Sequence, residues 1–374
     1  MRRTGPGRLP GMVLPVAAPV VAAAIVAVAI GMAVALLVVP WSSAAENTAG
    51  AAARQTTAAT STHPRGHAGT AAASCRVTPV VAGQKTAVPM RVTRILRVTF
   101  AVVTVCIDGS GPFRFMVDTG ASGTAISPPV ARTLHLATRG KSGEGFGASC
   151  TTTFHSVAVA NWSIDHVALA AQDVTTADLP KTPVLGVDGL LGSDVLSRFG
   201  AVTVDYDHSR LDLPGPEGTP TAAGAVQGPT ATPTPPVLLQ GQPTSAQVPM
   251  KVLSAHRQVL AFVPVRFGTR PPSSWVVDTG SSLSGVAVAA VRHLHLATVG
   301  GHLPLATVGC RTAVSFAKSG QWAVGSTRLD PQDLVAIRLP GVSSHGVEGL
   351  LGSDVFSRFD QITVDYAGGR LLLG

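Results

Sequence analysis

Two stretches of this chain decide its fold: residues 115–122 read FMVDTGAS, and residues 275–282 read WVVDTGSS. In each stretch a short apolar run, typical of a buried strand, ends in Asp-Thr-Gly. The strand therefore delivers a carboxylate to a turn. Gly120 and Gly280 permit backbone conformations that are closed to other residues, and they leave space beside that carboxylate. The same local setting is thus expected twice in one chain.

The two stretches belong to a longer repeat with a constant shift of 160 residues. The repeated segments are VPM at 88–90 and 248–250, LHLAT at 134–138 and 294–298, GLLGSDV at 189–195 and 349–355, and TVDY at 203–206 and 363–366. Cys150 likewise returns as Cys310, and no net insertion or deletion separates these landmarks. The chain therefore contains a folding unit of about 125 residues that has been duplicated.

Within each unit the apolar residues follow the pattern of β-strands. Runs rich in β-branched residues and bounded by Gly, Ser or Pro predict strands. The predicted strands are 98–107, 113–117, 157–160, 167–170, 259–267 and 275–277, with a closing hairpin formed by 202–206 and 211–213. We therefore expect an all-β protein of two lobes related by a pseudo-twofold axis.

One short helix is expected in each lobe, directly after the Gly-Leu-Leu-Gly motif. In the first lobe the run 194–199 has this pattern, and Ser193 or Asp194 is the predicted N-cap. Asp194 and its repeat Asp354 could instead bond the catalytic loop, but their position favours helix caps. His135 and His295 also recur, on a predicted surface helix with no evident ligand partner.

Composition divides the remainder of the chain into segments. Residues 46–74 contain mainly Ala, Thr, Ser and Gly. Such a segment cannot bury enough surface to offset its ordering entropy, so we expect a disordered stalk. Residues 214–247 are rich in Pro, Thr, Ala and Gly and are predicted to form a linker. The predicted lobes are then residues 75–213 and 248–374.

The N-terminal 45 residues form a separate predicted element. Three arginines within the first eight residues precede an uncharged stretch over 9–45, most apolar over 20–39. A helix of about 20 such residues is about 30 Å long, which is enough to cross a bilayer. We expect a hydrophobic helix over residues 1–45 that is either a membrane anchor or a signal peptide cleaved before Glu46. The arginines stay on the cytoplasmic side, so the rest of the chain is expected outside the cell membrane, secreted or anchored.

All four cysteines lie beyond this segment: Cys75, Cys106, Cys150 and Cys310. An even number in an oxidising compartment predicts two disulfides, and three pairings are possible. The cysteines and histidines do not have the spacing of a zinc site, so no metal is expected.

The net charge of +8 does not indicate a nucleic-acid partner. No run of Lys and Arg is longer than two residues, and aromatic residues do not alternate with the basic ones. Only 13% of the residues are charged. Nucleic acid is therefore excluded as an expected partner.

The duplicated Asp-Thr-Gly has a chemical consequence if the pseudo-twofold axis brings Asp118 and Asp278 face to face. Two carboxylates within hydrogen-bonding distance cannot both ionise, so they share one proton. The ionised member can take a proton from a water, and the protonated member can donate to a developing oxyanion. Thr119 and Thr279 offer hydroxyls that can bond across to the opposite lobe.

These residues carry a resemblance to aspartic proteases. The stretch at 115–122 resembles the active-site motif of the retropepsin type, and the stretch at 275–282 is closer to the pepsin version. The GLLG segments at 189–192 and 349–352 resemble the second family signature. The resemblance covers about residues 88–213 and 248–374 and implies a monomeric enzyme, fused from two retropepsin-like units, that needs no cofactor.

The resemblance also implies roles for individual residues. Asp118 and Asp278 would be catalytic, supported by Thr119, Gly120, Thr279 and Gly280. The residues that would brace the catalytic loops are Leu190, Leu191, Gly192, Leu350, Leu351 and Gly352. The family closes over its substrate with a glycine-containing hairpin, the flap, for which Gly143, Gly145 and Gly147 within 140–147 are the candidates. The matching stretch is 300–309, and neither stretch has the Tyr found in pepsin flaps.

Three hypotheses of function follow. The leading one is an extracytoplasmic aspartic endopeptidase that cuts peptides or protein segments held between the lobes, mostly by backbone hydrogen bonds. The alternative is a non-catalytic module on the same fold that binds peptides or envelope polymers, although a binding module has no need for a like-charge pair. A third hypothesis, with the same chemistry, is a processing enzyme that cuts its own stalk over residues 46–87.

Overall fold

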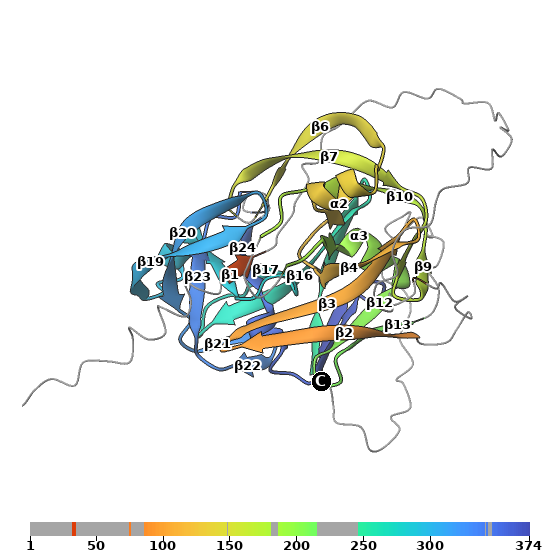
Figure 1. Ribbon diagram of the computed structural model, residues 1–374. Helices are drawn as coiled ribbons and strands as arrows, with labels where there is room; N and C mark the ends of the chain where they lie inside the picture. The colour runs from red at the N-terminus through yellow and green to blue at the C-terminus, as the bar shows by residue number, and fades with distance from the viewer. Residues whose placement is uncertain are drawn as a thin grey trace, which may run out of the picture.

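The computed structural model describes residues 32–34, 75, 86–147, 149–180, 186–214, 246–340, 342 and 346–374. The predicted stalk and most of the predicted linker lie outside these residues. The described part is mostly β-structure arranged as two lobes, as predicted (Figure 1).

The first lobe runs from β2 to β13. Its strands are β2 (Thr86–Ile95), β3 (Val98–Ile107), β4 (Ser110–Val117), β5 (Ala125–Ile126), β6 (Thr138–Phe146), β7 (Thr151–Val159), β8 (Trp162–Ile164), β9 (Val167–Leu169), β10 (Gln172–Thr176), β11 (Gly189–Leu191), β12 (Ala201–Asp205) and β13 (Arg210–Leu213). Its helices are α2 (Pro128–Thr133), α3 (Ser193–Leu196) and the 3₁₀ helix η1 (Ser197–Phe199).

The second lobe repeats this order. Its strands are β14 (Ala246–Pro249), β15 (Lys251–Ala255), β16 (Gln258–Phe267), β17 (Ser273–Val277), β18 (Gly285–Ala287), β19 (Thr298–Thr307), β20 (Cys310–Lys318), β21 (Trp322–Val324), β22 (Thr327–Leu329), β23 (Asp333–Ile337), β24 (Val347–Leu351), β25 (Gln361–Asp365) and β26 (Arg370–Leu373). Its helices are α4 (Val288–His293) and α5 (Ser353–Phe356). β14 begins two residues before the predicted end of the linker at 247.

A six-stranded sheet joins the lobes, in the order β14-β26-β25-β12-β13-β2. β12 pairs with β25 in antiparallel fashion, with Ala201 opposite Asp365 and Asp205 opposite Gln361. At the centre of this pairing Thr203 lies opposite its own repeat, Thr363, and their Oγ1 atoms are 2.7 Å apart. The register is therefore that of a pseudo-twofold axis through this threonine pair.

Within each lobe one short strand lies between the two ends of the Asp-Thr-Gly loop. β11 is parallel to β4, with Leu190 opposite Met116, and antiparallel to β5. β24 lies in the same way between β17 and β18. These central strands are apolar because both of their faces are covered, and Leu190, Met116 and Leu350 are at most 1% exposed. The core of each lobe thus holds the strand that leads to Asp-Thr-Gly.

Each lobe has two helices after Asp-Thr-Gly, where only one was predicted. α2 begins with two prolines after Ser127, in the first turn, where a helix tolerates them. It ends in a Schellman turn, in which the Leu136 N–H donates to the Ala131 carbonyl. His135 lies in this turn at a φ of 51°, and His295 adopts a φ of 50° after α4. Both histidines therefore lie just beyond a helix, so the prediction that placed them on one was wrong.

The N-cap of α3 is Gly192, which has no side chain to cap with. The prediction of Ser193 or Asp194 as the capping residue was therefore wrong. α5 begins in the same way after Gly352.

The predicted N-terminal helix lies outside the described residues, except for three positions. Met32–Val34 form a strand, β1, which pairs in parallel with β19, with Ala33 opposite Ala306. At these positions the structure contradicts a continuous helix. In the described part of the chain, no helix is long and apolar enough to cross a membrane.

The four cysteines form two disulfides, as predicted. Cys75 is bonded to Cys106 within the first lobe. Cys150 is bonded to Cys310, its own repeat, and this bond joins the two lobes.

Candidate active site

The two Asp-Thr-Gly loops meet where the lobes face each other. Asp118 follows β4 and its N–H donates to the Leu191 carbonyl at 3.0 Å; Asp278 makes the same bond to Leu351. Both aspartates are fully buried. A Cβ on Gly120 would lie 2.3 Å from Cγ of Asp278, and one on Gly280 would lie 2.2 Å from Cγ of Asp118. Each carboxyl is therefore seated on the glycine of the opposite loop.

The two threonines lock the loops together, as the sequence suggested. Thr119 Oγ1 donates to the Val277 carbonyl and Thr279 Oγ1 to the Val117 carbonyl, both at 2.7 Å. Each hydroxyl also accepts the backbone N–H of the opposite threonine, at 3.0 and 3.1 Å. Four hydrogen bonds, all buried and all between lobes, thus hold the carboxyl groups in register.

The carboxyl oxygens of each aspartate differ in their surroundings. Asp118 Oδ1 accepts the N–H groups of Gly120 and Ala121 at 3.1 and 2.9 Å, and Asp278 Oδ1 accepts that of Ser281 at 2.8 Å. Each Oδ2 is buried and has no hydrogen-bond partner among the described residues. Buried polar atoms of this kind are rare and mark a place where a polar group from outside can bind.

Burial raises the pKa of both carboxyl groups. The pKa of Asp118 is well above its ordinary value because of burial and then because of the nearby charge of Asp278. Burial raises the pKa of Asp278 to about 7, although the Ser281 N–H acts in the opposite direction. Two adjacent anions would repel in this dry setting, so the pair retains a shared proton.

The Gly-Leu-Leu-Gly segments lie directly against these loops. All four leucines of the two motifs are fully buried. A Cβ on Gly192 would lie 2.6 Å from the backbone of Gly123, and one on Gly352 would lie 2.7 Å from that of Leu283. Only glycine permits this close approach at either position.

Asp194 contacts the Asp-Thr-Gly loop and does not cap its helix. Its Oδ1 accepts both the N–H and the hydroxyl of Thr124, at 2.8 and 2.7 Å, and its Oδ2 accepts Nε2 of Gln172 at 3.0 Å. Thr124 Oγ1 in turn accepts the Gly192 N–H at 3.0 Å. Burial raises the pKa of Asp194. The bond to the loop, which the sequence left as the less favoured possibility, is the one observed.

The second lobe repeats this network around Asp354. Its Oδ1 accepts the N–H and the hydroxyl of Ser284, at 2.8 and 2.7 Å, and its Oδ2 accepts Nε2 of Gln332 at 2.7 Å. Gln332 Oε1 also accepts Nη2 of Arg358.

Sequence analysis missed a crossed pair of tyrosines beneath the loops. Tyr366 of the second lobe bonds Ser193 of the first at 2.7 Å, and Ser193 Oγ donates to the Thr119 carbonyl at 2.9 Å. Tyr206 of the first lobe bonds Ser353 of the second at 3.1 Å, and Ser353 Oγ donates to the carbonyl of Thr279 at 2.7 Å. The available signal was that the only two tyrosines of the chain are repeats of each other.

The flap candidates lie on a β-hairpin. Gly143 and Gly145 belong to β6, and Gly147 lies in the turn between β6 and β7. β19 and β20 form the matching hairpin in the second lobe. Both hairpins have a register shift at the same repeat position, between Arg139 and Gly143 and between Val299 and Leu303.

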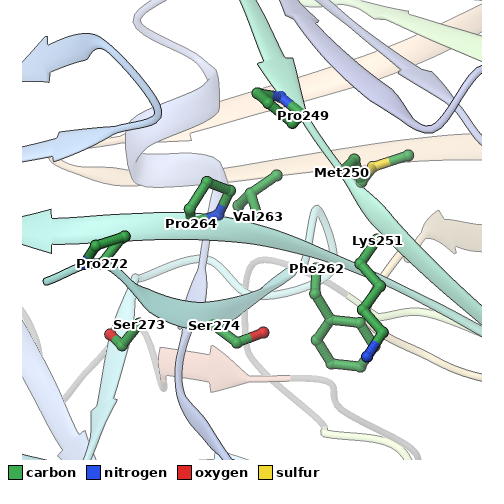
Figure 2. Close-up of a pocket in the computed structure, with 9 residues that line it drawn as sticks. All are labelled: Pro249, Met250, Lys251, Phe262, Val263, Pro264, Pro272, Ser273 and Ser274. Carbon is green, nitrogen blue, oxygen red and sulfur yellow. The ribbon is translucent and has the colours of Figure 1, made fainter.

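One pocket of about 410 Å³ lies elsewhere in the second lobe (Figure 2). Its lining residues are Pro249, Met250, Lys251, Phe262, Val263, Pro264, Pro272, Ser273 and Ser274. At the positions of Ser273 and Ser274 the first lobe has Phe113 and Arg114. None of the lining residues belongs to an Asp-Thr-Gly loop, so this pocket is not part of the candidate active site. Across the described ranges, no group of His, Cys, Asp and Glu could hold a metal ion.

Comparison with known proteins agrees with this geometry. Residues 103–195 and 263–355 each match the family model described as aspartyl protease, and each match runs from before Asp-Thr-Gly to beyond Gly-Leu-Leu-Gly. The chain therefore belongs to the aspartyl protease family, as two tandem units.

Other comparisons add less. No curated protein sequence matches the chain. Among solved structures, the crystal structure of basic 7S globulin from soybean is similar at 9% sequence identity, over 78% of this chain and 94% of that chain, with a TM-score of 0.36. A similarity of this degree carries no argument.

Proposed function

We propose that this protein is an aspartic endopeptidase in which Asp118 and Asp278 act as one catalytic pair. The observation that carries the proposal is their arrangement: two buried carboxyl groups, each seated on the glycine of the opposite loop, each with an unpartnered Oδ2. A like-charge pair is costly to bury unless its shared proton is used. This argues for catalysis over binding alone.

The pair can supply a base and an acid at once. The ionised carboxylate takes a proton from a water, whose oxygen attacks the peptide carbonyl carbon. The protonated carboxyl donates its proton to the carbonyl oxygen, which gives a neutral tetrahedral diol. Transfer of a proton to the amide nitrogen and cleavage of the C–N bond then release an amine and a carboxylic acid, and the pair again holds one proton.

The surrounding residues position this pair. Thr119 and Thr279 hold the loops in register, while Gly120 and Gly280 keep the space that the opposite carboxyl occupies. The Gly-Leu-Leu-Gly segments brace both loops from below. Because one chain supplies both halves, we propose a monomeric enzyme without a cofactor, whose substrate is a peptide or protein segment.

We place the enzyme outside the cell membrane, secreted or held there by its N-terminal segment. Two disulfides support this location, because they persist in oxidising compartments.

The test is a cleavage assay with the purified full-length protein. A diverse peptide pool is incubated from about pH 3 to about 7 and read by mass spectrometry, with and without a statine-type transition-state mimic. Wild type runs beside Asp118→Asn, Asp278→Asn and the control Asp173→Asn, which changes an exposed aspartate of β10. We expect cleavage by wild type and the control alone, and its block by the mimic.

The opposite result would favour the non-catalytic binding module. If folded wild type cuts nothing, or if either active-site variant cuts as well as wild type, the peptidase proposal fails. A shorter product that loses part of residues 46–87, and that requires Asp118, would identify self-processing.

A further inference from the structure

A disulfide joins the two hairpins that correspond to flaps. Cys150 lies at the turn between β6 and β7, and Cys310 begins β20 directly after the turn from β19. The bond between them therefore connects the tip of one hairpin to the tip of the other, across the boundary between the lobes.

This bond lies on the same pseudo-twofold axis as the aspartate pair. A twofold axis passes through every point where a residue meets its own repeat. That happens at three levels: Thr203 with Thr363, the Asp-Thr-Gly loops with each other, and Cys150 with Cys310. In Figure 1 β6 and β7 lie along the top, β12 and β13 lie toward the C-terminus at the bottom, and β4 and β17 lie between them. The bridge thus lies on the opposite side of the aspartates from the six-stranded sheet.

The hairpin tips also pack closely around the bridge. A Cβ on Gly147 would lie 2.1 Å from the carbonyl oxygen of Val308, and a Cβ on Gly309 would lie 2.6 Å from Thr152. The Gly309 N–H donates to the Asp178 carbonyl of the other lobe at 2.8 Å. The two tips are therefore one covalently closed unit, and the glycines allow their contact.

This closure limits how a substrate can reach the aspartates. Both carboxyl groups are fully buried beneath the joined hairpins. The chain from Cys150 through β12 to Cys310, together with the S–S bond, is a closed covalent ring. A polypeptide segment that lies between the hairpins and the aspartates passes through that ring. A segment without a free end cannot enter such a ring unless one of its bonds breaks.

We propose that the Cys150–Cys310 disulfide selects the substrates of this enzyme: with the bridge intact, only polypeptides that can be threaded by a free end are cut. Peptides and the ends of unfolded chains meet this condition, and internal loops of folded proteins do not. The inference rests on the proposed peptidase function and specifies the substrate class of the same site.

Reduction of the bridge would remove the restriction. Cys150 and Cys310 are half-buried, so a small dithiol has access to them. A dithiol attacks the S–S bond through its thiolate, forms a mixed disulfide and closes to its own cyclic disulfide. Its two electrons and two protons end on the cysteine thiols. The hairpins could then separate and admit a segment that has no free end.

The test compares a linear peptide with a large head-to-tail cyclised form of the same sequence. The linear peptide is one that wild type cleaves at an internal bond. Both forms are offered to full-length wild type, whose two disulfides are first verified by mass-spectrometric mapping. They are also offered to the double variant Cys150→Ser/Cys310→Ser. The control is Cys75→Ser/Cys106→Ser, which removes the other disulfide and leaves the bridge.

We expect wild type and the control to cut the linear peptide and to leave the cyclic form at background. The unbridged variant should cut both forms, as should wild type treated with a dithiol. The proposal is overturned if bridged wild type cuts the cyclic form as fast as the linear one, or if the unbridged enzyme cuts the linear peptide alone. Wild-type results decide the first point even if the variant does not fold. Failure to cut any linear peptide would instead reject the peptidase function itself.

Discussion

At the scale of single residues, the site depends on atoms that are absent. Gly120 and Gly280 have no Cβ, and each leaves the space that holds the carboxyl group of the opposite loop. Sequence analysis identified both glycines from their place after the aspartate. It assigned them freedom of the backbone, whereas the structure shows close approach across the lobe boundary. That contact could not be read from one loop, because it exists only when both loops meet.

Gly120→Ala should abolish peptidase activity. The added methyl would lie 2.3 Å from Cγ of Asp278, so one of the two loops has to move. Cleavage of a linear peptide, measured beside circular dichroism, checks this expectation. The matched control is Gly123→Ala, because a Cβ at Gly123 meets nothing within 4 Å. Equal activity of the two variants would contradict the seating of each carboxyl on the opposite glycine.

At the scale of elements, strands were predicted better than helices and contacts. β3 spans 98–107, as its β-branched run predicts, and β12 and β13 form the expected hairpin. α2 was not expected in the fold, because its double proline looks like a break although it lies in the first turn. The role of Asp194 depends on Thr124, 70 residues away in the chain. Spacing along the sequence does not reveal such a contact.

The crossed tyrosines give a prediction at this scale. Tyr366→Phe removes the hydroxyl that reaches from the end of β25 to Ser193, which holds the Thr119 carbonyl. We expect roughly tenfold lower kcat with little change in KM, because a lost buried hydrogen bond costs about 1 kcal/mol and loosens the catalytic loop. Tyr206→Phe should act alike by symmetry. Steady-state kinetics measure this, and an unchanged kcat in both variants would show that the network has no positioning role.

At the scale of the whole molecule, the duplication explains most of what could be predicted. A repeat at one constant shift predicts two lobes, a pseudo-twofold axis and a pair of facing aspartates. The disulfide pairing stayed open among three possibilities, because it depends on where the hairpin tips meet in space. The structure shows that the axis brings Cys150 to its own repeat. Repeat symmetry identifies such pairs only after the positions of the hairpins are known.

The buried carboxyl groups make stability depend on pH with a definite sign. Burial raises the pKa of Asp278 from 3.8 to about 7, and it also raises those of Asp118, Asp194 and Asp354. Between these pH values the folded protein holds more protons than the unfolded chain, so the free energy of unfolding falls as the pH rises. Urea unfolding at several pH values should show this fall, and Asp278→Asn should reduce it. Stability that increases from about pH 4 to about 7 would contradict the assignment.

Activity should follow the same carboxyl groups. The pair works with one shared proton, so cleavage should decline as that proton is lost on approach to neutral pH and above. A pH–rate profile of linear-peptide cleavage measures this. A rate that keeps rising through alkaline pH would be inconsistent with the shared proton.

The central claim is that the two halves of the chain form a single site. Calorimetric titration with a statine-type mimic of the tetrahedral diol tests it most directly. We expect one mimic to bind per chain, and Asp118→Asn and Asp278→Asn each to remove that binding while the protein stays folded. Two mimics per chain, or full binding retained by either variant, would show that the aspartates act separately and would contradict the account.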